Sequence, residues 1–154
     1  MTVFAVTAAI ILVLDIISKY IVSHSMALGS TIDVIPGIFD LTYIQNTGAA
    51  WGLFADKQVL LQVFTVLIMA GLTYYAVKHR KKLSMLELLS LGLVLGGGLG
   101  NFISRVISGY VVDFLNIQII PVFNVADIGI TVGCFLLVFS TLVAAQKDEE
   151  DGGL

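Results

Sequence analysis

The stretch VLLQVFTVLIMAGLTYYAV, residues 59–77, contains no charged side chain, and the basic segment KHRKK follows it directly at residues 78–82. A helix that crosses the hydrocarbon core of a bilayer needs about 20 apolar residues. Lysine and arginine gather on the cytoplasmic side of such helices. The stretch therefore predicts a transmembrane helix whose C-terminal end faces the cytoplasm.

The composition of the whole chain indicates the same class of protein. Of its 154 residues, 58% are hydrophobic and 12% are charged, whereas soluble domains average about 45–50% apolar and about 25% charged residues. No basic face with interleaved aromatic residues is present, which excludes a nucleic-acid-binding protein. Cys134, the single cysteine, lies in an apolar run and is interpreted as a packing residue. The length predicts one integral-membrane domain over residues 1–154.

Three further apolar stretches predict membrane-spanning helices at about 3–22, 86–103 and 124–145, which makes four with 59–77. The first lacks the charged start of a signal peptide and contains Asp15 and Lys19, so we interpret it as a retained helix. These two residues are four apart with the acid first, and they meet on one helix face. Two interpretations remain open. The pair neutralises itself so that the helix can insert, or it faces a polar site inside the bundle.

The third stretch carries a pattern of small residues. Glycine recurs every four residues from Gly92 to Gly100, a spacing that allows close packing of membrane helices. Packing accounts for the glycines but not for Asn101 and Arg105, which continue the Gly97 face in four-residue steps. An amide and a guanidinium at the outer end of a packed helix can hold an acidic site or a peptide carbonyl.

Between the first two helices the sequence has the period of β-strands. Residues 39–44 have the alternation of a strand, and residues 31–35 before Pro36-Gly37 can pair with them across a turn. Tyr43 and Trp51 are suited to a membrane interface. The segment Asn46-Thr47-Gly48-Ala49-Ala50-Trp51-Gly52 is rich in small residues that permit close backbone approach. We interpret residues 23–56 as a small interfacial sheet followed by a loop that enters the bundle; the alternative is an ordinary extramembrane loop.

Two aspartates lie in apolar sequence toward the end of the chain. Asp113 lies within Val111-Val112-Asp113-Phe114-Leu115-Asn116, and Asp127 ends Phe123-Asn124-Val125-Ala126-Asp127. A carboxylate at membrane depth is unfavourable and by default marks a functional site. Two acids in one site raise the pKa of one member, so that near neutral pH one is protonated and the other ionised. That is the chemistry of an aspartyl protease dyad.

Each aspartate also has a structural explanation. Asn124 can cap the last apolar helix, and Asp127 then falls in the first turn, where an acid stabilises the helix by about 0.3–1 kcal/mol. Residues 110–122 are too short for a span and end near Pro121, so we expect an interfacial strand or an amphipathic segment there. The alternative for Asp113 is thus an acid that snorkels to the interface.

The four predicted spans fix a topology. With residues 78–82 in the cytoplasm, both termini lie there as well. The Asn46 loop, Arg105, Asp113 and Asp127 then gather on the outer side. Asp15 lies about 10 Å below the outer end of the first helix.

Four motifs in this order and spacing resemble those of the lipoprotein signal peptidases, the bacterial type II signal peptidases. They are Asn46-Thr47-Gly48-Ala49-Ala50, Gly97-Gly98-Leu99-Gly100-Asn101 with Arg105, Val111-Val112-Asp113-Phe114, and Phe123-Asn124-Val125-Ala126-Asp127. With Asp15, Lys19 and the four-span layout, the resemblance covers nearly the whole chain. It implies an intramembrane aspartyl endopeptidase of the bacterial cytoplasmic membrane. Such an enzyme removes the signal peptide from diacylglyceryl-modified prolipoproteins by cutting before the lipid-modified cysteine.

The resemblance also implies the roles of individual residues. Asp113 and Asp127 are the expected catalytic pair. The other residues expected to line or support the site are Asn46, Gly48, Asn101, Arg105, Asn124, Ala126, Asp15 and Lys19. No metal or other cofactor is expected, because neither of the two histidines, His24 and His79, is near the pair. The expected partners are the lipid-modified substrate and membrane lipids, and the protein is expected to be a monomer.

Three positions depart from the family pattern. Ile16 stands where the family usually has glutamine, Ser104 where it has aspartate directly before Arg105, and Ile128 where serine commonly follows the second aspartate. If the missing acid normally orients Arg105, Ser104 leaves that guanidinium short of a partner.

The competing functions are a small transporter or proton relay and a scaffold without chemistry, since intramembrane Asp, Lys and Arg also build transporters. Transporters often contain internal repeats. The two halves of this sequence show none, which favours the peptidase.

Overall fold

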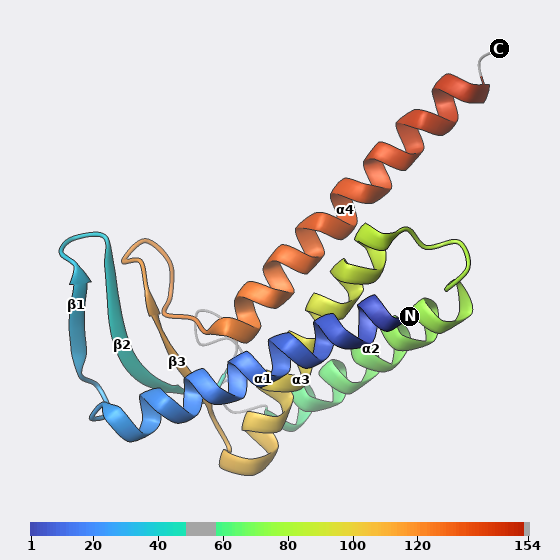
Figure 1. Cartoon of the computed structure of the whole chain (residues 1–154). Helices are drawn as coiled ribbons and strands as arrows, with labels where there is room; N and C mark the ends of the chain where they lie inside the picture. Colours follow the sequence, from blue (N-terminus) through green and yellow to red (C-terminus); the bar gives the residue numbers. More distant parts are fainter. Residues whose placement is uncertain (49–57, 153–154) are drawn as a thin grey trace.

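The computed structural model describes residues 1–48 and 58–152. In these residues the chain forms four α-helices and a three-stranded sheet. Their order is α1 (Thr2–Ser25), β1 (Thr31–Ile35), β2 (Phe39–Asn46), α2 (Gln58–Lys78), α3 (Met85–Ser108), β3 (Val111–Asn116) and α4 (Val125–Gly152). The sheet lies at one end of the helices, beside the C-terminal end of α1, and α4 runs away from it (Figure 1). The predicted fold class, four membrane helices with a small sheet, is confirmed.

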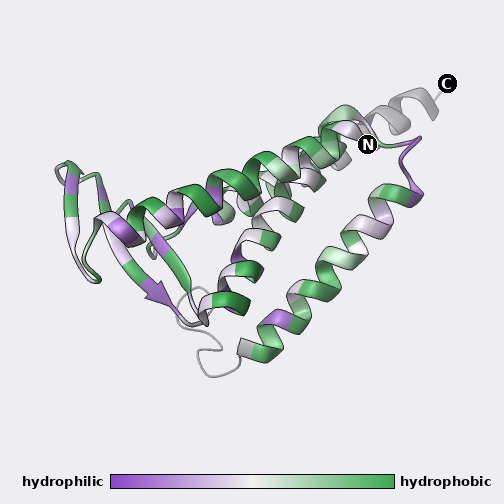
Figure 2. Ribbon diagram, turned by 60° about the horizontal axis from the view of Figure 1, so that its bottom comes forward, coloured by the Kyte–Doolittle hydropathy of each residue, from purple (hydrophilic) through white to green (hydrophobic). Residues whose placement is uncertain are grey.

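The helices are built for contact with lipid. Four helices in the described part of the chain are long and apolar enough to cross a membrane, namely Thr2–Ser25, Val59–Lys78, Met85–Ser108 and Val125–Val143. Hydrophobic residues occur along the whole length of these helices (Figure 2). Large apolar side chains such as Ile10, Leu67 and Phe135 are 53%, 62% and 68% exposed, which suits hydrocarbon rather than water. Cys134 is also exposed, so its interpretation as a residue packed inside the protein is wrong.

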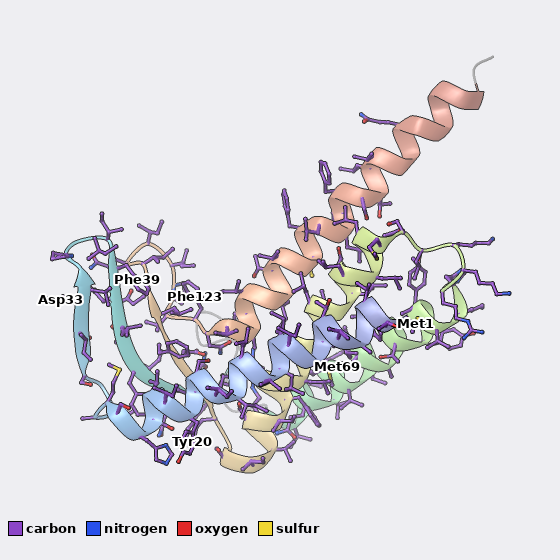
Figure 3. The ribbon with its side chains drawn as sticks, in the orientation of Figure 1. Met1, Tyr20, Asp33, Phe39, Met69 and Phe123 are labelled. Carbon is purple, nitrogen blue, oxygen red and sulfur yellow. The ribbon has the colours of Figure 1, made fainter. Side chains whose placement is uncertain are left out.

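α3 lies between α1 and α4 and contacts both through glycines. A Cβ atom added at Gly96 would lie 3.0 Å from the Cα of Ala8 in α1, and one added at Gly97 would collide with the carbonyl oxygen of Ala126 in α4. α2 packs on α3 through Met69, which is labelled in Figure 3, and this side chain meets Gly98. The small-residue pattern thus brings the α3 backbone against both neighbours, as the spacing predicts.

The sheet is antiparallel with the strand order β1-β2-β3. β1 pairs with β2 as predicted, with Thr31 opposite Thr42, and Gly37 in the connecting turn has a φ of 75°. Of the two structures expected within residues 110–122, the strand is the one formed. β3 pairs with β2 so that Asp113 lies opposite Ile44.

An apolar cluster joins the sheet to α1. Its buried members are Val22 of α1, Tyr43 of β2, and Val112 and Phe114 of β3. Tyr43 is only 5% exposed, and its hydroxyl accepts a hydrogen bond from Gln45 Nε2 at 3.1 Å. The expectation that Tyr43 anchors the membrane interface is therefore wrong, because the sheet packs this ring against the helix. The other expected anchor, Trp51, lies outside the described residues with Ala49, Ala50 and Gly52.

Substituting Gly97 by alanine is expected to lower the free energy of unfolding by about 1–3 kcal/mol, the usual effect of overpacking. The added methyl group meets backbone at Ala126, which cannot move aside as a flexible side chain can. Gly71→Ala on the exposed face of α2 is the matched control, since nothing lies within 4 Å of its added Cβ. Thermal unfolding in detergent measures both variants, and equal midpoints would contradict the close approach of α3 and α4.

Candidate active site

Asp113 is held near the middle of the sheet's third strand and is only 2% exposed. Its Oδ2 accepts a hydrogen bond from Asn46 Nδ2 at 2.8 Å, and its Oδ1 accepts one from Asn124 Nδ2 at 2.6 Å. Burial, opposed by the hydrogen bond from Asn46 and reinforced by the charge of Asp127, raises the pKa of Asp113 from 3.8 to about 6. Asp113 is therefore a carboxyl group that gains a proton close to neutral pH.

Asp127 lies in the first turn of α4, where Asn124 precedes the helix. Asn124 Oδ1 accepts from the Asp127 backbone N–H at 3.0 Å, and Asp127 Oδ2 accepts from the Asn124 N–H at 3.1 Å. This reciprocal cap satisfies N–H groups that a helix start leaves unpaired. The other oxygen, Oδ1, accepts from Asn101 Nδ2 at 2.8 Å. The predicted cap is present, and the capping carboxylate also faces the polar cluster.

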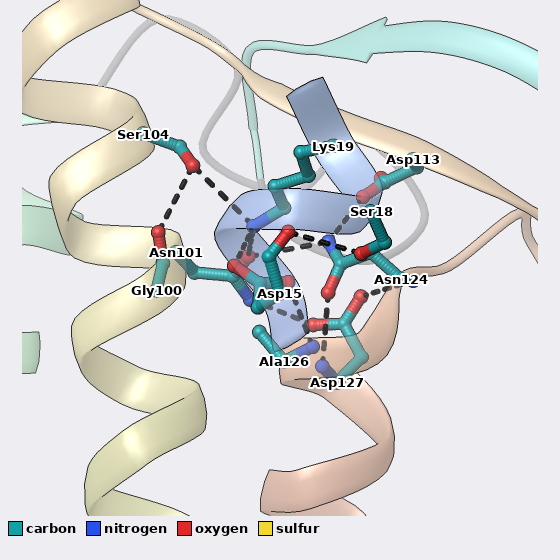
Figure 4. Close-up of polar contacts among 10 residues, drawn as sticks. All are labelled: Asp15, Ser18, Lys19, Gly100, Asn101, Ser104, Asp113, Asn124, Ala126 and Asp127. Carbon is teal, nitrogen blue, oxygen red and sulfur yellow. Dashed lines mark hydrogen bonds and ion pairs between the residues drawn. The ribbon is translucent and has the colours of Figure 1, made fainter. Parts of the chain in front are cut away.

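Asn124 links the two aspartates. It is fully buried, and its Nδ2 lies 2.6 Å from Asp113 Oδ1 and 3.2 Å from Asn101 Oδ1. One carboxamide thus joins α4, β3 and α3 (Figure 4). Residues far apart in sequence are held in one network by this side chain.

Asp15 and Lys19 lie inside the bundle, with exposures of 0% and 6%. Lys19 Nζ is 2.6 Å from Asp15 Oδ2 and donates to Asn101 Oδ1 at 2.9 Å. The second oxygen of Asp15, Oδ1, accepts from the Ala126 N–H at 2.9 Å. Of the two interpretations of this pair, the geometry supports the one in which it faces a polar site.

The start of the loop after β2 is tied to the same region. Arg105 Nη2 donates to the Gly48 carbonyl oxygen at 3.0 Å, and Asn46 Oδ1 accepts from the Gly48 N–H at 2.9 Å. Arg105 Nε is buried, and no hydrogen-bond partner for it occurs in residues 1–48 and 58–152. The guanidinium thus bonds to Gly48 beside the cavity, while the Asn46 amide contacts Asp113.

Ser104 faces Lys19 and not Arg105. Its Oγ donates to the Gly100 carbonyl oxygen at 2.9 Å and accepts from Lys19 Nζ at 3.3 Å. Ser104 contacts Lys19 because successive residues on a helix point about 100° apart, and Arg105 Nε has no hydrogen-bond partner in the described part of the chain. The other two departures, Ile16 and Ile128, are 45% and 42% exposed.

A cavity of about 640 Å³ opens beside both aspartates. Of the predicted site residues, those that line it are Asn46, Gly48, Asn101, Arg105, Asp113, Asn124 and Asp127. Asp15, Lys19 and Ala126 are not among its lining residues. They bond to one another, and Lys19 bonds to Asn101, which lines the cavity. Sequence reasoning missed the apolar wall formed by Ile120, Val122, Phe123 and Ile130. The apolar run directly before Asn124 was the available signal for it.

The arrangement places two carboxyl groups at one cavity. Two carboxylates with different environments can divide the roles of acid and base, and such a pair can activate water against an amide bond. In the described part of the chain, no group of three or more His, Cys, Asp or Glu side chains could hold a metal ion.

A family model described as "Signal peptidase (SPase) II" matches residues 7–143. The chain belongs to the signal peptidase II family. It is 38% identical over 154 residues to a lipoprotein signal peptidase of Enterococcus faecalis, with 99% of this chain and 94% of that protein covered. Membership in the signal peptidase II family confirms the predicted aspartic signal peptidase, and a transporter is not favoured.

Solved structures are similar over nearly the whole chain. One, described as "Bacterial membrane enzyme structure by the in meso method at 2.3 A resolution", has a TM-score of 0.86 and 32% identity, covering 98% of this chain and 92% of that chain. A second, at 1.9 Å, has a TM-score of 0.84 and 32% identity, covering 92% of this chain and 94% of that chain. The signal peptidase II chain thus has the fold of known membrane enzymes.

In this signal peptidase, Ser104→Asp is expected to pair with Lys19. A hydrogen bond between charged groups is worth about 1.5–3 kcal/mol, so a double-mutant cycle with Lys19→Met is expected to show coupling of about that size. The parallel cycle with Arg105→Met is expected to show much weaker coupling. Thermal stability in detergent measures both. Stronger coupling to residue 105 than to residue 19 would refute the placement of Ser104.

Proposed function

We propose that the protein removes the signal peptide from diacylglyceryl-modified prolipoproteins by cutting before the lipid-modified cysteine, with Asp113 and Asp127 as its catalytic pair. The observation that carries this proposal is that both carboxylates border one cavity and are joined through Asn124. The family and the 38% identical lipoprotein signal peptidase support the reaction and the substrate class.

In the proposed mechanism, ionised Asp127 takes a proton from a water molecule as the water oxygen attacks the scissile carbonyl carbon. Protonated Asp113 gives its proton to the carbonyl oxygen at the same step. When the tetrahedral intermediate collapses, the proton held by Asp127 goes to the leaving nitrogen. The hydroxyl proton of the intermediate returns to Asp113, and the pair is restored. General acid–base catalysis of this kind typically contributes about 10²–10⁴-fold in rate.

The cavity suits a substrate with a peptide part and an apolar part. On the polar side, Asn46 and Arg105 are positioned to bind backbone groups of the peptide. On the apolar side, Ile120, Phe123 and Ile130 offer a surface for hydrocarbon. In this proposal Asn101 and Asn124 orient the aspartates, and Asp15, Lys19, Gly48 and Ala126 support them. The chain acts as one domain and as a monomer surrounded by membrane lipids.

We further propose that the protein resides in the bacterial cytoplasmic membrane with both termini in the cytoplasm and the site toward the outer leaflet. The basic segment 78–82 supports this orientation. A reporter fused after Lys82 is expected to behave as cytoplasmic, and one inserted near Gly37 or Gln118 as external. The reverse pattern would overturn the orientation.

Asp113→Asn and Asp127→Asn are each expected to lower kcat by about 10²–10⁴-fold, because each removes an acid or a base while keeping the side-chain shape. Asp33→Asn, at an exposed position on β1, is the matched control and is expected to keep the activity of the wild type. The assay is cleavage of a synthetic diacylglyceryl lipobox peptide in detergent. Activity that survives either substitution would sink the catalytic assignment, and inhibition by chelators would count against a reaction without metal.

The pH dependence follows from Asp113. Because the protonated form acts as the acid and its pKa is raised to about 6, kcat/KM is expected to fall as pH rises through about 6. The hydrogen bond from Asn46 lowers this pKa, so Asn46→Ala is expected to move the basic limb to higher pH. Asp33→Asn again serves as the control. A basic limb that stays in place or moves to lower pH in Asn46→Ala would rule out Asp113 as the acid.

A further inference from the structure

The ion pair on α1 reaches the catalytic pair through one carboxamide. Lys19 Nζ lies 2.9 Å from Asn101 Oδ1, and Asn101 Nδ2 lies 2.8 Å from Asp127 Oδ1. An ammonium group has donors and no acceptor. The amide atom that faces Lys19 must therefore be the oxygen, which directs the NH2 group of Asn101 at Asp127.

A second obligate donor fixes the neighbouring amide. The backbone N–H of Asp127 donates to Asn124 Oδ1 at 3.0 Å, so the NH2 group of Asn124 faces away from it. This group donates to Asp113 Oδ1 at 2.6 Å and to Asn101 Oδ1 at 3.2 Å. The Asn101 oxygen thus receives two donors. Turning the amide over would set its NH2 group against both of them.

The two aspartates consequently have different donors. Asp127 accepts from the backbone N–H of Asn124 and from an Asn101 amide that is itself bonded to an ammonium. Donors to a carboxylate favour its ionised form, and a bonded cation strengthens the amide as a donor. Asp113 accepts from the two neutral amides of Asn46 and Asn124. The stronger set of donors faces Asp127.

The remaining charged groups do not reverse this asymmetry. Arg105 of α3 interacts electrostatically with both Asp113 and Asp127. Asp15 of α1 is bonded to Lys19 at 2.6 Å and to the N–H of Ala126 at 2.9 Å. Lys19 also interacts electrostatically with both aspartates, but its hydrogen bond to Asn101 leads to Asp127.

We propose that Lys19 is a positioning residue of the peptidase: it locks the Asn101 carboxamide with its NH2 group toward Asp127, which assigns the base to Asp127 and leaves the shared proton on Asp113. This inference rests on the proposed catalytic pair. It predicts that the identity of the acid and the base depends on a side chain that does not line the cavity.

The first test is the double variant Asp15→Asn/Lys19→Met. It leaves the net charge of the site unchanged and creates no lone buried charge, while it removes the Lys19–Asn101 hydrogen bond together with the contacts of Lys19 to Asp15 and Ser104. Lys78→Met, at an exposed lysine on α2, is the matched control. kcat and KM are measured on the diacylglyceryl lipobox peptide from about pH 4.5 to about 8.5.

The expected result is a fall in kcat of about tenfold or more, with KM changed by less than about threefold. The fall in kcat is expected because the Asn101 amide is then free to turn its oxygen toward Asp127, which removes the donor that holds the base in place. Lys78→Met is expected to match the wild type. A kcat per folded molecule within about threefold of the wild type would overturn the proposal and leave Lys19 as a stabilising residue.

The second test, Asn101→Asp, keeps the shape of the side chain and decides the question if the double variant fails to fold. Lys19 keeps an oxygen acceptor and gains a charged one, so the thermal midpoint is expected to be equal or higher. The NH2 group toward Asp127 is replaced by oxygen, so kcat is expected to fall about 100-fold or more. A kcat within about threefold of the wild type would overturn the proposal.

Asp113→Asn and Asp127→Asn are measured in the same assay. They distinguish a failure of the proposed function from a failure of the role of Lys19. If they retain activity, the proposed function fails. If they are inactive while the Lys19 and Asn101 variants behave as the wild type, only the role of Lys19 fails.

Discussion

The close approach of α3 to α4 at Gly97 is the constraint on which the site depends. A side chain at this position would occupy the space of the Ala126 carbonyl group. Because glycine leaves that space open, Asn101, one turn further along α3, comes within 2.8 Å of Asp127. On another face of the same helix, Gly100 leaves room for the carboxylate of Asp15. One helix with glycines on two faces therefore sets the depth and spacing of the polar residues.

Polar groups inside an apolar bundle are tolerated here because each helps to satisfy the others. The first N–H groups of a helix have no partner within it. In α4 the N–H groups of Ala126 and Asp127 are taken up by Asp15 and Asn124. α1 thus caps α4 across the bundle, and the same aspartate neutralises Lys19. The buried charges of α1 and the start of α4 stabilise one another, so neither could be placed alone at this depth without a large desolvation penalty.

Much of the fold follows from periodicity, which the sequence contains. The uncharged run 59–77 predicts a helix, alternation predicts β2 with β1 paired to it across a turn, and the spacing of Asn124 and Asp127 predicts the cap. Periodicity shows which face of a helix or strand is apolar. It does not show whether that face packs against protein or against lipid. Cys134 was misplaced because protein-facing and lipid-facing positions of a membrane helix are both apolar. Tyr43 was misplaced because an aromatic ring suits a bilayer interface and a sheet-to-helix contact equally well.

The same limit applies to the candidate site. Resemblance to the family named residues that the structure brings together at the cavity or directly behind it, but adjacency in sequence suggested that Ser104 serves Arg105. The helix instead turns Ser104 toward α1 and Arg105 toward the loop at Gly48. The apolar wall of the cavity was not predicted, because apolar side chains are common throughout a membrane protein and do not by themselves mark a site.

The segment between the two aspartates is closed on itself by a short ladder. Phe123 exchanges hydrogen bonds with Leu115 at 2.8 and 3.0 Å, and its carbonyl oxygen also accepts from Phe114 at 2.9 Å. These hydrogen bonds close the loop between Leu115 and Phe123. The tip of this loop contributes Ile120 and Val122 to the cavity wall. Substitutions at the tip would therefore reshape the cavity wall, while the hydrogen bonds between Leu115 and Phe123 keep the chain beside the two aspartates in place.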